Sequence, residues 1–124
     1  MPRTCLILEA VPLVAQDLAL TARDSFGLEP AIAGDEDTAR SLLAAAPDAR
    51  VELAFIHQDA ATFADSPLHR QLKAQGARIV LLGTEVRAPQ DGAGWQVLRL
   101  PFTTDQLVAL VKGPGRGVDG TLAP

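Results

Sequence analysis

The chain has 124 residues, of which 48% are hydrophobic and 21% charged, so it can fill one compact core and lacks the composition of a disordered chain. Its formal net charge of −4 argues against nucleic acid as a partner, and its single cysteine excludes both an internal disulfide and a cysteine-based zinc cage. Its apolar runs are shorter than the roughly 20 residues that cross a bilayer, and residues 1–20 lack a signal-peptide pattern. We therefore expect a soluble, cytoplasmic domain that binds neither nucleic acid nor membrane.

Strand and helix signals alternate along the chain. Short apolar runs with no polar face are typical of strands covered on both sides, and apolar stripes at helical spacing indicate helices. In chain order the predicted elements are a strand at 4–9, a helix at 12–26, a strand at 30–33, a helix at 35–47, a strand at 51–57, a helix at 66–76, strands at 78–82 and 96–100, and a helix at 103–111. The stripe of the first helix includes Leu13, Leu18 and Leu20. Residues 30–33 suit only a sheet edge, because Pro30 cannot donate to a ladder.

Buried strands separated by helices predict a parallel sheet with helices on both faces. Five such strands fit a flavodoxin-like three-layer sandwich with the strand order 2-1-3-4-5. Ligands of this fold lie beyond the carboxyl ends of strands one and three, where the sequence places Glu9 and residues 57–59. We expect the domain to span residues 1–112, and the glycine-rich residues 113–124 to form a flexible tail or linker.

Four segments of the sequence contain or adjoin the carboxyl ends of the predicted strands. They are Leu6 to Leu13, Leu53 to His57, Ile79 to Thr84, and Val97 to Phe102. In their order and spacing they resemble the receiver domain of two-component response regulators (CheY-like), over roughly residues 3–112. The resemblance implies an acidic pair after strand one, a phosphorylated aspartate after strand three, a Ser or Thr after strand four and Lys-Pro after strand five. It also implies a helix between strands four and five, which Pro89 and the glycines of residues 85–94 predict to be shortened or lost.

The sequence departs from the receiver pattern at nearly every catalytic position. Glu9 keeps the first acid, but Ala10 stands at the second acid, His57 at the nucleophile, Gly83 at the hydroxyl and Leu100 at the lysine. A lone carboxylate holds Mg²⁺ poorly, and losing one contact to a developing charge costs about 3–4 kcal/mol of barrier. We therefore interpret the chain as a degenerate pseudo-receiver without catalytic residues, metal or cofactor, and not as an enzyme.

Three further residues lie in or next to the four resembling segments: Thr84, Pro101 and Cys5. Thr84 either supplies the hydroxyl one position late or is a turn residue after Gly83. Pro101 is retained, and the resemblance implies a structural cis bond before it. Cys5 falls inside the first strand and is expected to be a small buried hydrophobe.

His57 and Glu9 are expected at the ends of neighbouring strands about 4.8 Å apart. The simplest interpretation is a hydrogen bond or ion pair that fills an emptied acidic pocket. A pH-sensing pair, phosphorylation of His57, and a transition-metal site with Asp59 or His69 remain open. Asp59 is either a displaced phosphoacceptor or a solvated or helix-capping residue, and His69 is expected to be a solvated polar residue on its helix.

Retention of the fold with loss of the catalytic positions favours a signalling module that works by protein contact or dimerisation. Its partner would be a histidine kinase, a regulator, an output protein or a second copy. The alternatives are a receiver phosphorylated at Asp59, and a small flavodoxin-like enzyme or metal-binding domain that uses His57. Val86, Trp95 and Val97 are candidates for an interface beside the shortened helix, whereas the simpler role for Trp95 is to cover the core.

Overall fold

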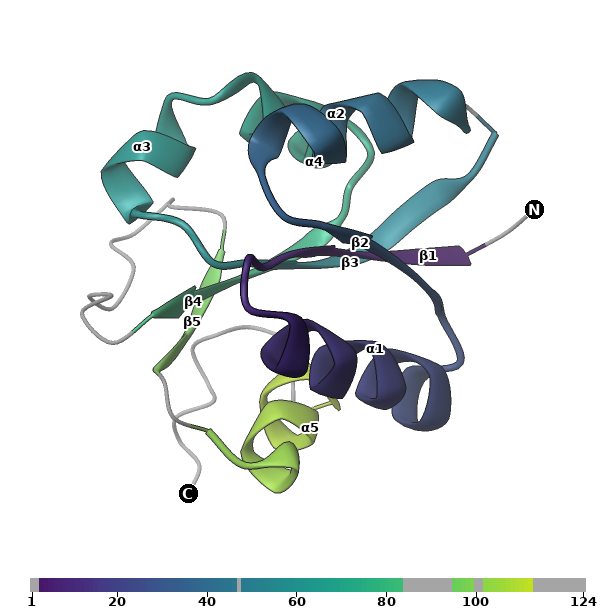
Figure 1. Cartoon of the computed structure of the whole chain (residues 1–124), viewed down its shortest axis with the longest axis vertical. Coiled ribbons are helices and arrows are strands. Elements are labelled where there is room, and N and C mark those ends of the chain that lie inside the picture. The colour runs from purple at the N-terminus through teal and green to yellow at the C-terminus, as the bar shows by residue number, and fades with distance from the viewer. Residues whose placement is uncertain (1–2, 47, 84–94, 100–101, 113–124) are drawn as a thin grey trace.

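The structure is a computed structural model that describes residues 3–46, 48–83, 95–99 and 102–112. A central sheet lies between two layers of helices (Figure 1). In chain order the elements are β1 (Arg3–Leu8), α1 (Pro12–Phe26), β2 (Glu29–Ala33), α2 (Glu36–Ala45), β3 (Arg50–Ile56), α3 (Ala60–Ala64), α4 (Pro67–Ala74), β4 (Arg78–Gly83), β5 (Gln96–Arg99) and α5 (Thr104–Lys112).

The sheet is parallel throughout, in the order β2-β1-β3-β4-β5. This order confirms the predicted flavodoxin-like sandwich. Leu8 at the end of β1 pairs with Ala33 of β2 on one side and with Ile56 of β3 on the other. The carboxyl ends of β1 and β3 therefore lie side by side, and the residues that follow them enter the same region.

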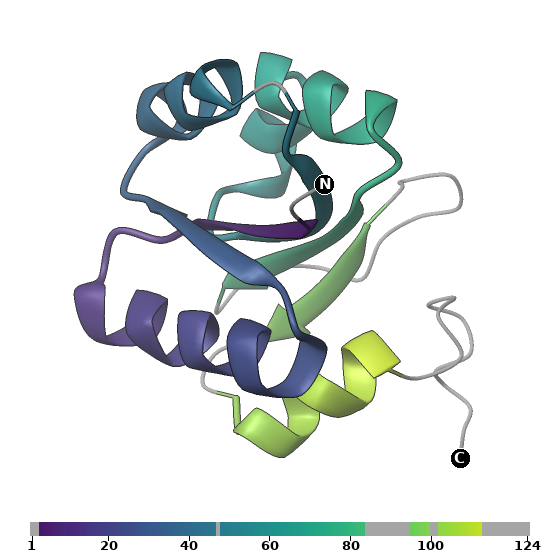
Figure 2. The same cartoon turned by 90° about the vertical axis from the view of Figure 1, so that its right-hand side faces the viewer.

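Helices cover both faces of the sheet, with α1 and α5 on one face and α2, α3 and α4 on the other (Figure 2). Side chains alternate between the two faces along each strand. In β1, Cys5 and Ile7 join the cluster under α1 and α5, whereas Leu6 and Leu8 join the cluster under α2 to α4. Burial on both faces explains why the strands read as apolar runs with no polar side.

The boundary of α1 follows its sequence signals. Pro12 occupies the first helical turn, where its missing N–H removes no helical bond. Gly27 ends the helix with a φ of 64°, in the left-handed region, and its N–H donates to the carbonyl of Ala22.

The side of α1 that faces the core differs from the predicted stripe. Ala15, Leu18 and Ala22 are buried, whereas Leu13 is 78% exposed and Leu20 is 55% exposed. The three buried residues share one side of the helix, which packs on the sheet, and the two exposed leucines lie on the opposite side. Leu13 and Leu20 were predicted to share that stripe, and this part of the prediction is wrong.

The other differences from the predicted elements are local. The five-residue helix α3 was not predicted, and β1 and β3 end at Leu8 and Ile56, one residue before the predicted ends. Several expectations lie outside the described residues: the shortened helix at 85–94, the roles of Thr84, Val86, Leu100 and Pro101, and the tail at 113–124. In the part of the chain that the structure describes, no helix is long and apolar enough to span a membrane.

Cys5 provides a test of the core. Its side chain has no exposed surface, and burial raises the pKa of its thiol to about 12. In the unfolded chain the thiol ionises at its ordinary pKa, so the contribution of Cys5 is complete below that value and is lost as pH rises toward the folded pKa. We expect the free energy of unfolding to fall by up to about 1.4 kcal/mol per pH unit from this residue above about pH 9.

Urea unfolding of the wild type and of Cys5→Ala between about pH 8 and about pH 10 measures this contribution as the difference in pH dependence. Identical pH dependence in the two proteins would contradict it, as would a thiol reagent that modifies the folded protein as fast as the unfolded chain.

Candidate functional site

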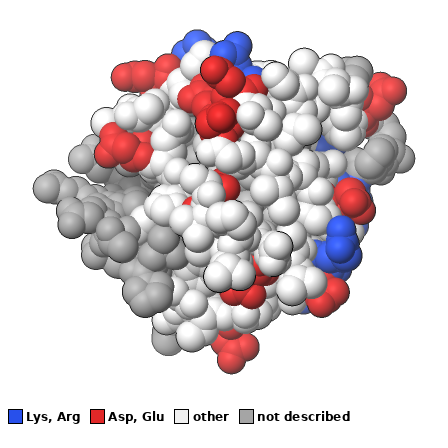
Figure 3. All heavy atoms as spheres, viewed as in Figure 1, with Lys and Arg blue, Asp and Glu red and all other residues white. Residues whose placement is uncertain are grey.

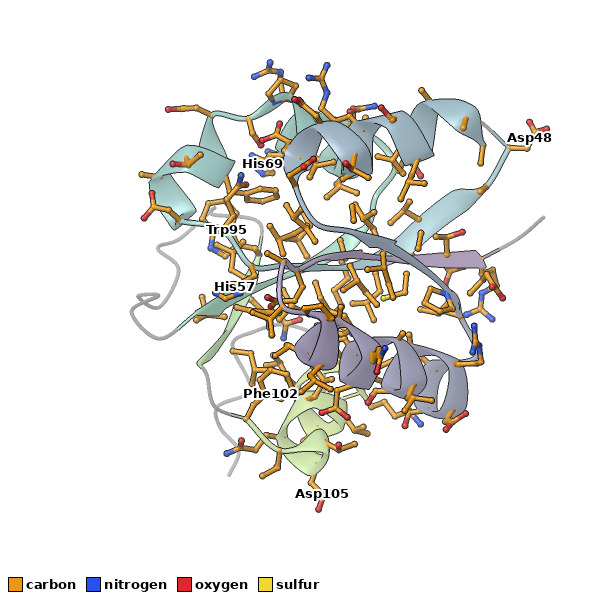
Figure 4. The ribbon with its side chains drawn as sticks, viewed as in Figure 1. Asp48, His57, His69, Trp95, Phe102 and Asp105 are labelled. Atoms are coloured by element: carbon orange, nitrogen blue, oxygen red, sulfur yellow. The ribbon has the colours of Figure 1, made fainter. Side chains whose placement is uncertain are left out.

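The strand ends bring Glu9 and His57 together. The parallel ladder continues one residue past each strand, because the Glu9 N–H donates to the Ala33 carbonyl at 2.9 Å and the His57 N–H donates to the Leu8 carbonyl at 2.8 Å. Both residues are thereby held on ordered backbone at the carboxyl edge of the sheet, and Figure 4 shows His57 at this edge.

The side chains of this pair make the expected hydrogen bond. Nδ1 of His57 lies 2.8 Å from Oε1 of Glu9, so the imidazole donates to the carboxylate. The Glu9 side chain is only 1% exposed, whereas that of His57 is 37% exposed. The imidazole therefore stands between a buried carboxylate and solvent.

The second oxygen of Glu9 serves α1. Its Oε2 accepts a hydrogen bond from the Val11 N–H at 3.0 Å. Val11 is the N-cap residue of α1, and its N–H has no acceptor within the helix, so the Glu9 carboxylate supplies one. The position near a helix N-terminus also favours negative charge. With a donor on each oxygen, this buried acid meets the requirement that buried polar groups be paired.

The neighbouring predicted positions contribute little that could hold a ligand. Ala10 is exposed and has no polar side chain, and Gly83 is a buried residue at the end of β4 with no hydroxyl. Asp59 caps α3, because its carboxylate accepts from the Thr62 N–H at 3.1 Å and from the Thr62 hydroxyl at 3.3 Å. Asp59 therefore has the helix-capping role that was one of its two predicted roles.

A second contact at this edge was missed from the sequence. The Gln58 amide donates weakly to Glu36 at 3.5 Å, and its buried Oε1 finds no hydrogen-bond partner among the residues that the structure describes. Glu36 opens α2 directly after its N-cap, Asp35, which accepts from the Thr38 N–H at 2.8 Å. That bond lowers the pKa of Asp35. The acidic run 35–37 signalled only a helix start, and nothing in it indicated a contact with the residue after His57.

These residues do not fit a magnesium ion. Mg²⁺ needs several oxygen ligands in an octahedron. Both oxygens of Glu9 already accept hydrogen bonds, and His57 turns a donor toward them. Within residues 3–46, 48–83, 95–99 and 102–112, no group of three or more His, Cys, Asp or Glu side chains could hold a metal ion. The described residues thus also give no support to a metal site made by His57 with Asp59 or His69.

The environment of His69 differs from the prediction. Its ring centroid lies 4.9 Å from that of Phe63 and 5.4 Å from that of Trp95, and its Nδ1 lies 3.1 Å from the Ala64 carbonyl (Figure 4). His69 is therefore half-buried in an aromatic cluster, and the prediction of a solvated residue is wrong. Trp95 and Val97 are also half-buried and pack against the core under α2 to α4. Trp95 thus helps to cover the core, and only part of its surface is left for an interface.

Comparison with known proteins identifies solved structures with a similar fold. No family model and no curated protein matches the chain. Among solved structures, a response regulator receiver domain protein from Bacillus halodurans is 16% identical with a TM-score of 0.63, covering 88% of this chain and 93% of that one. A response regulator from Thermotoga maritima is 19% identical with a TM-score of 0.62, covering 90% and 96%.

The chemotaxis response regulator CheY4 of Vibrio cholerae is 21% identical with a TM-score of 0.62, covering 87% of this chain and 94% of that one. The chain therefore has the fold of response-regulator receiver domains. At these identities the likeness concerns the fold alone.

The hydrogen bond between Glu9 and His57 can be measured by a double-mutant cycle. Removing His57 leaves a buried carboxylate oxygen without its donor, which costs about 1–3 kcal/mol. We expect Glu9→Ala and His57→Ala to be coupled by about 1–3 kcal/mol in the free energy of unfolding. Urea unfolding of the wild type, both single variants and the double variant gives this coupling energy.

Arg3 and Glu52 provide a matched control, because they join the same two strands near their opposite ends. Their side chains are 58% and 35% exposed at an N–O distance of 2.8 Å, so their coupling should be smaller and should vanish at high salt. A negligible coupling between Glu9 and His57, or one as sensitive to salt as the control, would contradict the description of the site.

Proposed function

We propose that this chain is a receiver-type signalling module that acts by contact with another protein and carries no aspartyl-phosphate switch. The single observation that carries the proposal is the hydrogen bond from His57 to the buried carboxylate of Glu9. It lies at the carboxyl edge of β1 and β3, where this fold places its ligands.

Phosphoryl transfer to a carboxylate concentrates negative charge, which a metal ion and a cationic side chain must neutralise. The residue at the nucleophile position is an imidazole, and its partner Glu9 has no oxygen left to bind a metal. The sequence also places Leu100, not a lysine, at the cation position. Each electrostatic loss of this kind is worth about 3–4 kcal/mol of barrier, so their combination favours an inactive pocket.

The alternative functions have weaker support. A phosphorylated Asp59 would have to break two hydrogen bonds to Thr62 that begin α3, and it would still lack a neighbouring cation at the receiver position. An enzyme or metal-binding site at His57 needs several convergent polar groups. Beside Glu9 the described residues offer only Gln58, whose amide turns to Glu36.

A phosphate-donor assay tests this proposal. The purified chain is incubated with Mg²⁺ and acetyl phosphate or a phosphoramidate, and covalent phosphate is measured by intact mass. We expect no incorporation into the wild type, because neither the metal nor the phosphoryl oxygens find their partners. A triple variant with Ala10→Asp, His57→Asp and Leu100→Lys, which introduces the receiver residues at these positions, should incorporate a measurable amount of phosphate.

Two controls make the result specific. A receiver domain with a complete site, run in parallel, shows that the donor and the detection work. If the wild type incorporates phosphate, Asp59→Asn and His57→Ala identify the acceptor. Stable incorporation that either substitution abolishes would refute the proposed function and select the corresponding alternative.

A further inference from the structure

A group of exposed apolar side chains lies on α1, its N-cap residue and the edge strand β2. Among the described residues, the large hydrophobic side chains with the highest exposure are Leu13 at 78%, Leu20 at 55%, Val11 at 48% and Ile32 at 45%. The first three belong to α1 or its cap, and Ile32 belongs to β2. Much of the surface in Figure 3 is neither acidic nor basic, and its Lys and Arg atoms lie near the margins of the view.

This surface contains a ridge. Leu13 and Leu20 are seven residues apart in α1 and therefore lie on one line of the helix. The buried residues Ala15, Leu18 and Ala22 occupy the opposite side, so the two leucines project away from the sheet. These side chains are left in water, and a partner that covers them would gain the hydrophobic free energy of their burial.

A groove lies next to the ridge, between α1 and β2. It has a volume of about 410 Å³, and its lining residues come from both elements: Gln16, Ala19, Leu20, Arg23, Pro30 and Ile32. Leu20 is shared, because it forms one wall of the groove and one end of the ridge. Ridge and groove are therefore side by side on a single face, which we call the α1–β2 face.

The edge of β2 is poorly suited to receiving another strand. The Glu9 N–H bonds to the Ala33 carbonyl, so by the alternation of a parallel ladder Ala31 and Ala33 face β1 while Pro30 and Ile32 direct their backbone outward. Pro30 has no N–H, which removes one of the outward donors. A partner on this face therefore packs by its side chains and not by extending the sheet.

The charges on the α1–β2 face complement one another. Asp17 is exposed and stands between Leu13 and Leu20 on the helix surface, whereas Arg23 lines the groove. Among the described residues Arg23 has one loose ionic partner, Glu29, at 3.8 Å, and both side chains are more than half exposed. A two-fold axis would place the acidic side of one ridge against the arginine of the opposite groove.

From this arrangement we propose that a second copy of this chain docks on the α1–β2 face. Each ridge of Leu13 and Leu20 enters the groove of the other copy, and Asp17 of each copy pairs with Arg23 of the other. A face that carries both a ridge and a groove is self-complementary, as an isologous two-fold interface requires. The inference rests on the proposed function, since it names the protein that a contact-based signalling module binds.

Sedimentation analysis of the full chain over a range of concentrations tests the inference. We expect a reversible dimer whose dissociation constant rises about tenfold or more in Leu13→Glu and in Leu20→Glu. Leu42→Glu is the matched control, because Leu42 is an exposed leucine on α2, the helix layer across the sheet, and it should leave the dimer intact. Circular dichroism verifies that each variant is folded.

Charge-reversal variants distinguish this docking arrangement from non-specific hydrophobic association. Arg23→Asp and Asp17→Arg should each weaken the dimer, and the double variant should restore it. A wild type that is monomeric at its highest soluble concentration would overturn the inference, as would a dimer that none of these variants weakens. The phosphate-donor assay does not depend on oligomeric state, so a monomer that takes up no phosphate would refute the dimer and leave the proposed function standing.

Discussion

A buried carboxylate dictates the structure of the candidate site. Glu9 is almost completely removed from water, and an unpaired charge in that position would cost far more than the domain could tolerate. Its two oxygens are satisfied by His57 from the end of β3 and by the N–H of Val11 at the start of α1. One side chain therefore joins β1, β3 and α1, and it fixes the imidazole at the edge of the sheet.

This pairing separates the fold from the chemistry associated with it. The strand order and the two-layer core need only apolar side chains at the strand and helix positions that face each other. Phosphorylation of a carboxylate needs acidic side chains that are free to bind a metal ion, whereas both oxygens of Glu9 accept hydrogen bonds from His57 and Val11. The proposed function therefore depends on the surfaces of the domain, and among the described residues the α1–β2 face combines exposed leucines, a groove and complementary charges.

Much of this arrangement could be predicted from the sequence. The five apolar runs and their intervening helices predicted a parallel sheet, because right-handed crossovers allow few topologies, and five such strands fit the flavodoxin-like order that the structure shows. The contact between Glu9 and His57 followed, since adjacent parallel strands end at the same edge. The capping role of Asp59 was one of two options, and only the position of Thr62 within a helical turn selected it.

Other features depend on tertiary packing that a periodic pattern does not record. Helix α3 has five residues, too few for an amphipathic stripe, and its main signal is the Asp59 cap three residues before Thr62. The stacking of His69 depends on Phe63 and Trp95, which come from separate segments. Leu13 and Leu20 lie on the side of α1 opposite to Ala15, Leu18 and Ala22, and the sheet packs against that second side, so the two leucines face solvent.

Nuclear magnetic resonance of the His57 ring nitrogens, with and without Mg²⁺, tests directly whether Glu9 and His57 are held as a hydrogen-bonded pair. We expect an Nδ1 that carries a proton in slow exchange with solvent, together with Glu9 and His57 signals that Mg²⁺ does not shift. An unprotonated Nδ1 in rapid exchange, or a saturable shift of the Glu9 carboxylate signal on addition of Mg²⁺, would contradict this pairing.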